Sequence, residues 1–292
     1  MNHAIIGANV MDRLVKCPGS LKCGSGTLKQ KDEQRKKNLK NYYTKNRIEC
    51  NRPTELGMKI DEMSKNLVRT HFGAKEKIVY TSDLDYADLE IYTQAKEYAD
   101  HMINVRKKMS KCFLDPGYDV SKYIQNLDDV EFRVSFNPDY IAISESGKIV
   151  YISDLTTGVS YSRNKMFQVI CCAVGYMEYH SECERFICEV FNSKTKEVNI
   201  CKFDKEEIEA YRDDIIIPTL EKVREALISP KQEIENFRNR NSWCRGFCIF
   251  KDDGCCSCKS VDIVENDIQI QLSFDYKHMS QKDLDNYLDL WW

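Results

Sequence analysis

DVEFRVSFNPDYIAISESGKIVYISDLTTG, residues 129–158, is the stretch of sequence that decides the fold. Polar and apolar residues alternate along it, which is typical of β-strands that bury one face. The pattern divides into three segments, residues 129–136, 139–144 and 148–153, and Ser146-Gly147 supplies a tight turn between the last two. We therefore expect three consecutive strands, of which the last two form a hairpin.

Helical patterns lie on both sides of these strands. Upstream, a helix is expected from residue 54 to about residue 71. A second is marked by an apolar stripe with steps of three and four, formed by Ile91, Ala95, Tyr98, Met102, Val105 and Met109. Downstream, the patterns predict a helix over 162–179, a hairpin of 184–191 with 196–203, and a helix over 204–227. This order predicts an α/β fold, with a small mixed sheet flanked by helices.

Composition limits the function classes. The chain has 292 residues, 42% of them hydrophobic, and a formal net charge of -3, so any binding to nucleic acid requires a local basic surface. No apolar run is long enough to span a bilayer, and the first residues lack the pattern of a signal peptide. We expect a cytoplasmic protein without a membrane partner.

The chain divides into five segments. We expect an N-terminal helix over residues 8–16 within segment 1–23, a basic insertion at 24–53, a core at 54–228, a cysteine-rich segment at 229–258 and an acidic tail at 259–292. Basic and aromatic side chains alternate in the insertion, as in surfaces that bind single-stranded nucleic acid. A solvated loop is the other interpretation. The residues concerned are Lys36, Lys37, Lys40, Tyr42 and Tyr43.

The tail has a strand-like segment at 268–274 and then a helical pattern from residue 280 with an acidic face. Such a helix can dock a partner, for example a recombination or single-strand-binding protein. Packing on its own domain is the more common arrangement.

Two aspartates flank the predicted hairpin. Asp139 begins one strand and Asp154 ends the next, so a meander can bring both to one edge of the sheet. Neighbouring carboxylates repel each other unless a cation lies between them, and Mg²⁺ or Mn²⁺ suits an all-oxygen site. Two aspartates that merely form turns are the alternative.

Cysteines cluster near the C-terminus. Residues 242–258 read SWCRGFCIFKDDGCCSC, a turn-rich segment whose thiolates can hold Zn²⁺ or an iron–sulfur cluster. In a reducing compartment, clustered cysteines indicate metal ligands before disulfides. The candidate ligands in this segment are Cys244, Cys248, Cys255 and Cys256, with Cys258 as a spare.

These residues resemble a known family. The order Glu131, Asp139, Asp154-Leu155-Thr156-Thr157-Gly158 and Gln168 is similar to the PD-(D/E)XK nuclease pattern, closest to the RecB-like branch. His3 to Ser20, and then Glu55, Gly57 and Asp61-Glu62, resemble the opening elements of phage-encoded RecB-like nucleases. Some relatives, of the AddB and CRISPR-associated types, hold a [4Fe–4S] cluster on one N-terminal and three C-terminal cysteines.

The resemblance implies a restriction-endonuclease-like core and a metal-dependent DNA nuclease, an exonuclease acting in phage recombination or replication in the host cytoplasm. It implies Mg²⁺ or Mn²⁺ ligands at Asp61, Glu131, Asp139 and Asp154. It also implies a [4Fe–4S] cluster, with Zn²⁺ as the alternative, held by Cys17, Cys244, Cys248 and either Cys255 or Cys256.

Three positions depart from that pattern. Asp61 stands where the family has a histidine ligand, Thr156 where it has the catalytic lysine, and Cys172 where it has a tyrosine. Lys165 precedes Gln168 by three residues, so both share one helix face, and Lys165 can supply the missing ammonium. An exposed helix lysine is the other interpretation. The alternative function is a catalytically degenerate nuclease fold that binds DNA or a partner without cutting.

Overall fold

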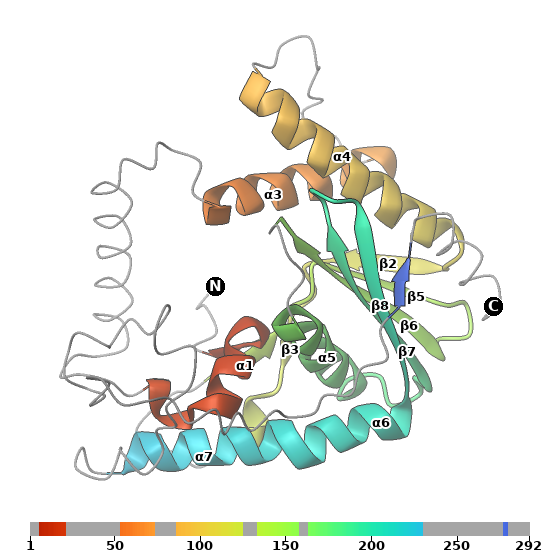
Figure 1. Cartoon of the computed structure of the whole chain (residues 1–292). Helices are drawn as coiled ribbons and strands as arrows, with labels where there is room; N and C mark the ends of the chain where they lie inside the picture. The colour runs from red at the N-terminus through yellow and green to blue at the C-terminus, as the bar shows by residue number, and fades with distance from the viewer. Residues whose placement is uncertain are drawn as a thin grey trace, which may run out of the picture. The chain divides into compact units, whose positions relative to one another are not determined.

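The computed structural model describes residues 6–21, 53–73, 86–124, 133–157, 163–229 and 277–279 (Figure 1). It is an α/β protein in which mixed sheets are flanked by helices. The chain forms two compact units. The first unit comprises Met1–Glu49, Asp119–Ser135 and Ala210–Phe274, and the second comprises Cys50–Tyr118, Phe136–Glu209 and Asp275–Trp292.

A six-stranded sheet, in the order β2-β5-β6-β7-β8-β9, is the centre of the second unit. The expected hairpins are confirmed: β5 pairs antiparallel with β6, and β7 with β8. Only the β6–β7 pair is parallel among the described strand pairs of this sheet, and α5 (Arg163–Met177) makes the crossover that such a pair requires. The strands are β2 (Lys111–Leu114), β5 (Tyr140–Ile143), β6 (Ile149–Thr156), β7 (Arg185–Asn192), β8 (Glu197–Asp204) and β9 (Lys277–Met279).

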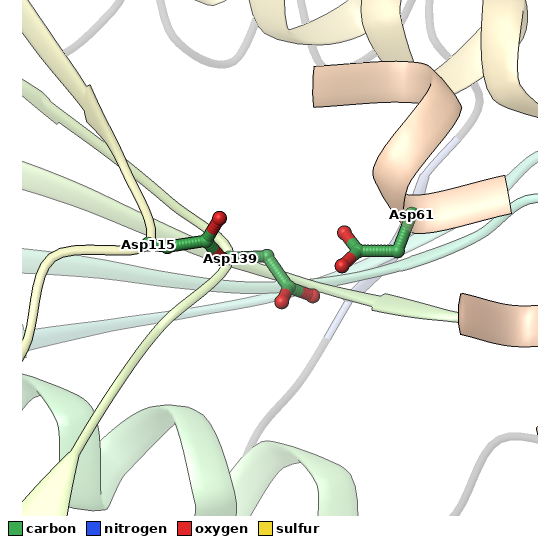
Figure 2. Close-up of side chains that lie close together, drawn as sticks. All are labelled: Asp61, Asp115 and Asp139. Carbon is green, nitrogen blue, oxygen red and sulfur yellow. The ribbon is translucent and has the colours of Figure 1, made fainter. Parts of the chain in front are cut away.

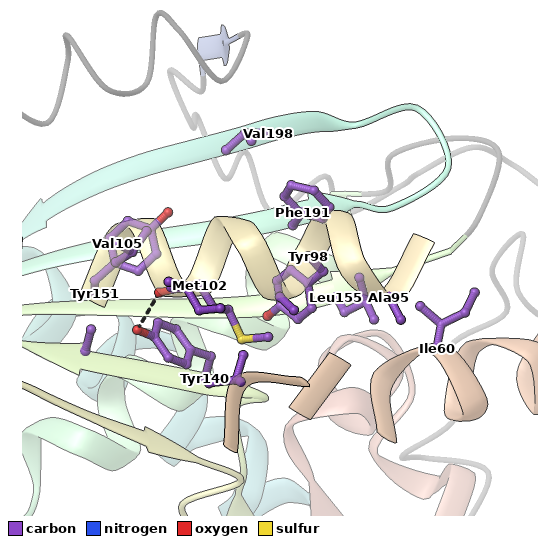
Figure 3. Packing of buried hydrophobic residues seen from close by; sticks show 14 of the residues in the cluster. Ile60, Ala95, Tyr98, Met102, Val105, Tyr140, Tyr151, Leu155, Phe191 and Val198 are labelled. Atoms are coloured by element: carbon purple, nitrogen blue, oxygen red, sulfur yellow. Dashed lines mark hydrogen bonds between the residues drawn. The ribbon is translucent and has the colours of Figure 1, made fainter. Parts of the chain in front are cut away.

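The two faces of this sheet are covered by different helices. On one face, α4 (Tyr86–Lys107) and α3 (Pro53–His71) bury the main apolar cluster, to which the expected stripe of α4 contributes (Figure 3). Within it the Tyr140 hydroxyl donates to the Met102 carbonyl oxygen at 3.0 Å. On the other face α5 packs against β6 and β7. Because side chains alternate along a strand, β6 presents successive residues to α4 and to α5.

The first of the three expected strands belongs to a different sheet from the other two. The described part of that segment contains β4 (Val134–Phe136), which does not pair with β5. It lies in a separate three-stranded sheet between β1 (Ile6–Gly7) and β3 (Tyr118–Asp119). The neighbour of β5 is instead β2, which has only four residues, too few for alternation to identify it.

In the first unit, α1 (Ala8–Lys16), η1 (Pro18–Leu21) and α7 (Ile217–Ile228) pack together. The helix expected over 204–227 consists of α6 (Lys205–Ala210), a π-helical turn at Tyr211–Ile216 and α7. A short helix, η3, covers Ser121–Ile124. The tail strand expected at 268–274 and the helix after residue 280 lie outside the described residues. None of the described helices combines the length and the apolar character that crossing a membrane requires.

Candidate metal-binding and catalytic site

Aspartates on or next to three neighbouring strands of the sheet lie side by side. β5 and β6 pair Tyr140 with Ser153, so one step further Asp139 lies opposite Asp154. β2 pairs its last residue with Tyr140, and the next residue, Asp115, donates its backbone N–H to the Asp139 carbonyl oxygen at 3.2 Å. Sheet register alone therefore gathers three carboxylates at one place. Asp154 lies inside β6, not at its end, because the strand continues to Thr156.

Helix α3 adds a fourth carboxylate and a lysine. The Asp61 carboxylate faces those of Asp115 and Asp139 (Figure 2). Lys65, one turn further along α3, donates from its ammonium to Asp61 Oδ2 at 2.6 Å, to Asp139 Oδ1 at 3.3 Å and to Asp115 Oδ1. The side chain of Lys65 is only 5% exposed, so an ammonium group is buried among three acids.

Helix α5 supplies two donors to Asp154. The Lys165 ammonium lies 2.8 Å from Asp154 Oδ2, and the Gln168 amide donates to Asp154 Oδ1 at 3.2 Å. The spacing of three residues places both side chains on one face of α5. The structure thus brings together four predicted residues, Asp139, Asp154, Lys165 and Gln168.

The backbone constrains the site on two sides. The N–H of Leu155 donates to Asp139 Oδ2 at 2.8 Å, so both oxygens of Asp139 have a partner. On α3, a Cβ at Gly57 would lie 3.1 Å from Thr157 Oγ1, tighter than an ordinary contact. Glycine therefore lets the start of α3, and with it Asp61, approach the end of β6 closely.

Negative charge is in excess in this site. Burial, together with the neighbouring Asp139, raises the pKa of Asp154 to about 7 and that of Asp61 to about 6. Burial alone would lower the pKa of Lys165, but the Asp154 carboxylate outweighs it and raises that pKa. For Lys65 the carboxylates of Asp139 and Asp61 likewise outweigh burial and raise the pKa. Both lysines therefore stay charged.

The donor set fits a hard divalent cation. One carboxylate oxygen from each of Asp61, Asp115 and Asp139 lies within 4.8 Å of the others, and oxygen ligands are those that Mg²⁺ and Mn²⁺ prefer. Asp61 Oδ1 is buried and has no hydrogen-bond partner among the described residues, so this set contains one acceptor without a donor. Asp61 and Asp139, two of the expected ligands, belong to this set.

The departures from the family pattern are visible in the structure. Thr156, for which the resemblance predicted a catalytic lysine position, lies in β6 two residues after Asp154 and therefore on the same face of the strand. Cys172 is buried on α5, where burial and the nearby Asp154 raise the pKa of its thiol. Cys17 is buried at the end of α1. Several predicted residues lie outside the described residues: Glu131, Lys36, Lys37, Lys40, Tyr42, Tyr43, Cys244, Cys248, Cys255 and Cys256.

Two residues of the site escaped the sequence analysis, Lys65 and Asp115. Lys65 follows Asp61 by four residues, the spacing at which helical side chains meet, so helical periodicity contained that signal. Asp115 precedes Pro116-Gly117 and looks like an ordinary turn residue. Its left-handed φ of 50°, which aspartate tolerates better than most residues, fits that turn. Only the pairing of β2 with β5 places it in the site.

Comparison with known proteins adds little. No protein-family model matches the chain, and no curated protein matches it. Among solved structures, the chain is similar to the crystal structure of SSO0001, with 14% sequence identity and a TM-score of 0.28, over 69% of this chain and 96% of that one.

Proposed function

We propose that this chain is a metal-dependent DNA nuclease of the RecB-like PD-(D/E)XK type, an exonuclease acting in phage recombination or replication. The observation that carries the proposal is the contact of Lys165 with Asp154, 2.8 Å between ammonium and carboxylate. The family lysine acts beside this aspartate, and here an ammonium reaches the same carboxylate from α5 while Thr156 occupies the usual position.

Each residue has a role in this proposal. Asp61, Asp115, Asp139 and Asp154 would hold the divalent ion, which when bound would activate water and stabilise charge on the reacting phosphate. Lys165 would orient the attacking water and balance the developing negative charge. Gln168 donates to Asp154 Oδ1 and fixes the direction of that carboxylate, and it would also position the DNA strand. The Leu155 amide fixes Asp139 in the same way.

The test is DNA cleavage by anaerobically purified protein. End-labelled single-stranded and duplex DNA would be incubated with Mg²⁺ or Mn²⁺ and wild type, Asp154→Asn or Asp100→Asn. Asp100 is an exposed aspartate on α4, so it controls for the loss of one carboxylate. We expect cleavage by wild type and Asp100→Asn and none by folded Asp154→Asn. Equal cleavage by all three proteins would exclude this site as its source.

A second candidate function has an observation of its own. The buried ammonium of Lys65 is bound to Asp61, Asp115 and Asp139, which is how a nuclease fold that has lost its metal would balance its acids. Such a protein would bind DNA or a partner without cutting. It predicts salt-dependent DNA binding by wild type with no cleavage in Mg²⁺ or Mn²⁺.

We also propose a cysteine-bound [4Fe–4S] cluster, or Zn²⁺, as a staple between the N-terminal helix and the C-terminal segment. Cys17, buried after α1, is the one described member of the candidate ligand set. Iron, sulfide and zinc analysis of anaerobically purified protein tests this. We expect about four irons and four sulfides, or one zinc, per chain. The content should fall in Cys17→Ser but not in Cys112→Ser, a half-buried cysteine of β2. Metal-free wild type would contradict it.

A further inference from the structure

Lys65 is an unusual cation because its ammonium group is buried among carboxylates. Its side chain is 5% exposed, and its ammonium donates to three different carboxylates. A buried ammonium without such partners would lose much of its hydration energy. The three carboxylates are therefore the reason that Lys65 is held inside.

The same three carboxylates form the set that fits a divalent ion, since their oxygens lie within 4.8 Å of one another. The Lys65 ammonium contacts each of them, so it lies where a shared cation would lie. Lysine is also suited to leave, because its ammonium sits on a flexible four-carbon chain. A metal ion and the ammonium therefore compete for the same oxygens.

The charges in the site favour replacement of the Lys65 ammonium by a divalent ion. Among the described residues, Asp61, Asp115, Asp139 and Asp154 form ion pairs with the ammonium groups of Lys65 and Lys165 alone, so this set of six side chains retains negative charge. Asp61 Oδ1, buried without a partner, is an acceptor that Lys65 does not satisfy. An ion with two charges and several coordination positions satisfies this set better than one ammonium does.

We propose that Lys65 is a displaceable internal cation: it holds Asp61, Asp115 and Asp139 together when the site has no divalent ion and leaves them when one binds. The inference rests on the proposed function for the identity of the incoming ion. It assigns Lys65 the role of setting how much free metal the protein needs, since each binding event must first expel the ammonium.

Mn²⁺ binding in the absence of DNA tests the inference. Affinity would be measured by calorimetry and by the loss of the free Mn²⁺ electron paramagnetic resonance signal, for wild type, Lys65→Met and Lys65→Gln. Gln keeps amide donors for the carboxylates but carries no charge, so it guards against failure of Lys65→Met to fold. Lys59→Met, an exposed lysine on the same helix, is the matched control.

We expect both Lys65 variants to bind Mn²⁺ at least about tenfold more tightly than wild type, because a competing positive charge within a few ångströms is removed. The melting temperature of either variant should also rise more with added Mn²⁺ than that of wild type. Lys59→Met should match wild type. Equal or weaker Mn²⁺ binding by both Lys65 variants would overturn the inference.

These outcomes separate the inference from the proposed nuclease. If wild type cleaves DNA while the Lys65 variants bind Mn²⁺ no better, the nuclease stands and the role of Lys65 is rejected. If the variants gain affinity while wild type never cleaves, the role of Lys65 stands and the binding module replaces the nuclease. No Mn²⁺ binding by any variant would reject the exchange of cations.

Discussion

The polar side chains on the two faces of β6 belong to two different clusters. Facing α5, Asp154 belongs to the acidic site, where carboxylates outnumber ammonium groups. Facing α4, Tyr151 and Ser153 belong to a buried network around Glu189. Because alternate residues of one strand form the two faces, the two clusters differ in their side chains but share the backbone of β6.

The network facing α4 is closed. Glu189 is fully buried and accepts from the Ser153 hydroxyl at 2.7 Å, from the Tyr151 hydroxyl and from His101 Nε2 at 2.9 Å. Tyr98 extends it with a 3.0 Å hydrogen bond to Ser153. Every group named here has a partner, whereas in the acidic site Asp61 Oδ1 has none in the part of the chain that the structure describes. We infer that the closed network specifies the fold and that the open site is built to bind.

Removing one carboxylate from each face should give the largest contrast. Glu189→Gln places an amide donor among hydroxyl and imidazole donors, so we expect the free energy of unfolding to fall by about 3–5 kcal/mol. Asp154→Asn relieves carboxylate repulsion and keeps an acceptor for Lys165, so we expect a change within about 1 kcal/mol. Urea denaturation in EDTA measures both. Similar losses in the two variants would remove the distinction between the faces.

Moving the ammonium group from position 165 on α5 to position 156 on β6 tests the acidic site. Lys165→Ala should lower DNA cleavage about a hundredfold, since one positioned donor to a developing charge is lost. Thr156→Lys in that background restores an ammonium at the family position, on the same face of β6 as Asp154, and should recover about tenfold of the loss. Single-turnover cleavage rates measure this. The control is Thr156→Met, which adds length without charge and should recover nothing.

The acidic site should also make stability depend on pH in a distinctive direction. Asp154 and Asp61 have folded-state pKa values of about 7 and about 6, above the value of 3.8 that represents the unfolded chain. The folded state therefore binds more protons between these values. The contribution of the two groups is fully present below about pH 4 and is lost as pH rises to about 7.

In EDTA we expect the free energy of unfolding to fall by roughly 4 kcal/mol from pH 5 to pH 8 through these groups. The decrease should be smaller in Asp154→Asn, and subtraction of the two curves removes the other titrating groups. Mg²⁺ should restore stability mainly at pH 8, where the carboxylates are ionised. Parallel curves for the two proteins would refute the assignment.

The smallest expected effect concerns the spacing of α3 from β6. Gly57→Ala gains helix propensity but places a Cβ 3.1 Å from Thr157 Oγ1. In a Thr157→Ala background the contact is gone, so the alanine should stabilise the protein by about 0.5–1 kcal/mol more than it does in wild type. A double-mutant cycle by thermal denaturation measures this coupling. Additive effects would mean that α3 and the end of β6 adjust freely.

Residue spacing along the chain predicted the elements whose contacts lie close together in sequence. The α4 stripe, the two hairpins and the helix carrying Lys165 and Gln168 all follow from spacing along the chain. The pairing of β2 with β5 did not, because four residues carry too little alternation and the partner lies 26 positions or more away. Asp115 was missed for the same reason, since only that pairing takes it out of an ordinary turn.

The alternation of polar groups along β6 also determines how this strand can pair. A slip of one residue against β5 or β7 would turn Asp154 toward Tyr98 and Phe191 and would turn Tyr151 and Ser153 toward α5. Glu189 would lose two of its donors, and a carboxylate would enter the aromatic layer. Misregistered pairings are thus penalised on both faces at once. The acidic residues therefore help to select the correct topology during folding, before the protein meets any ligand.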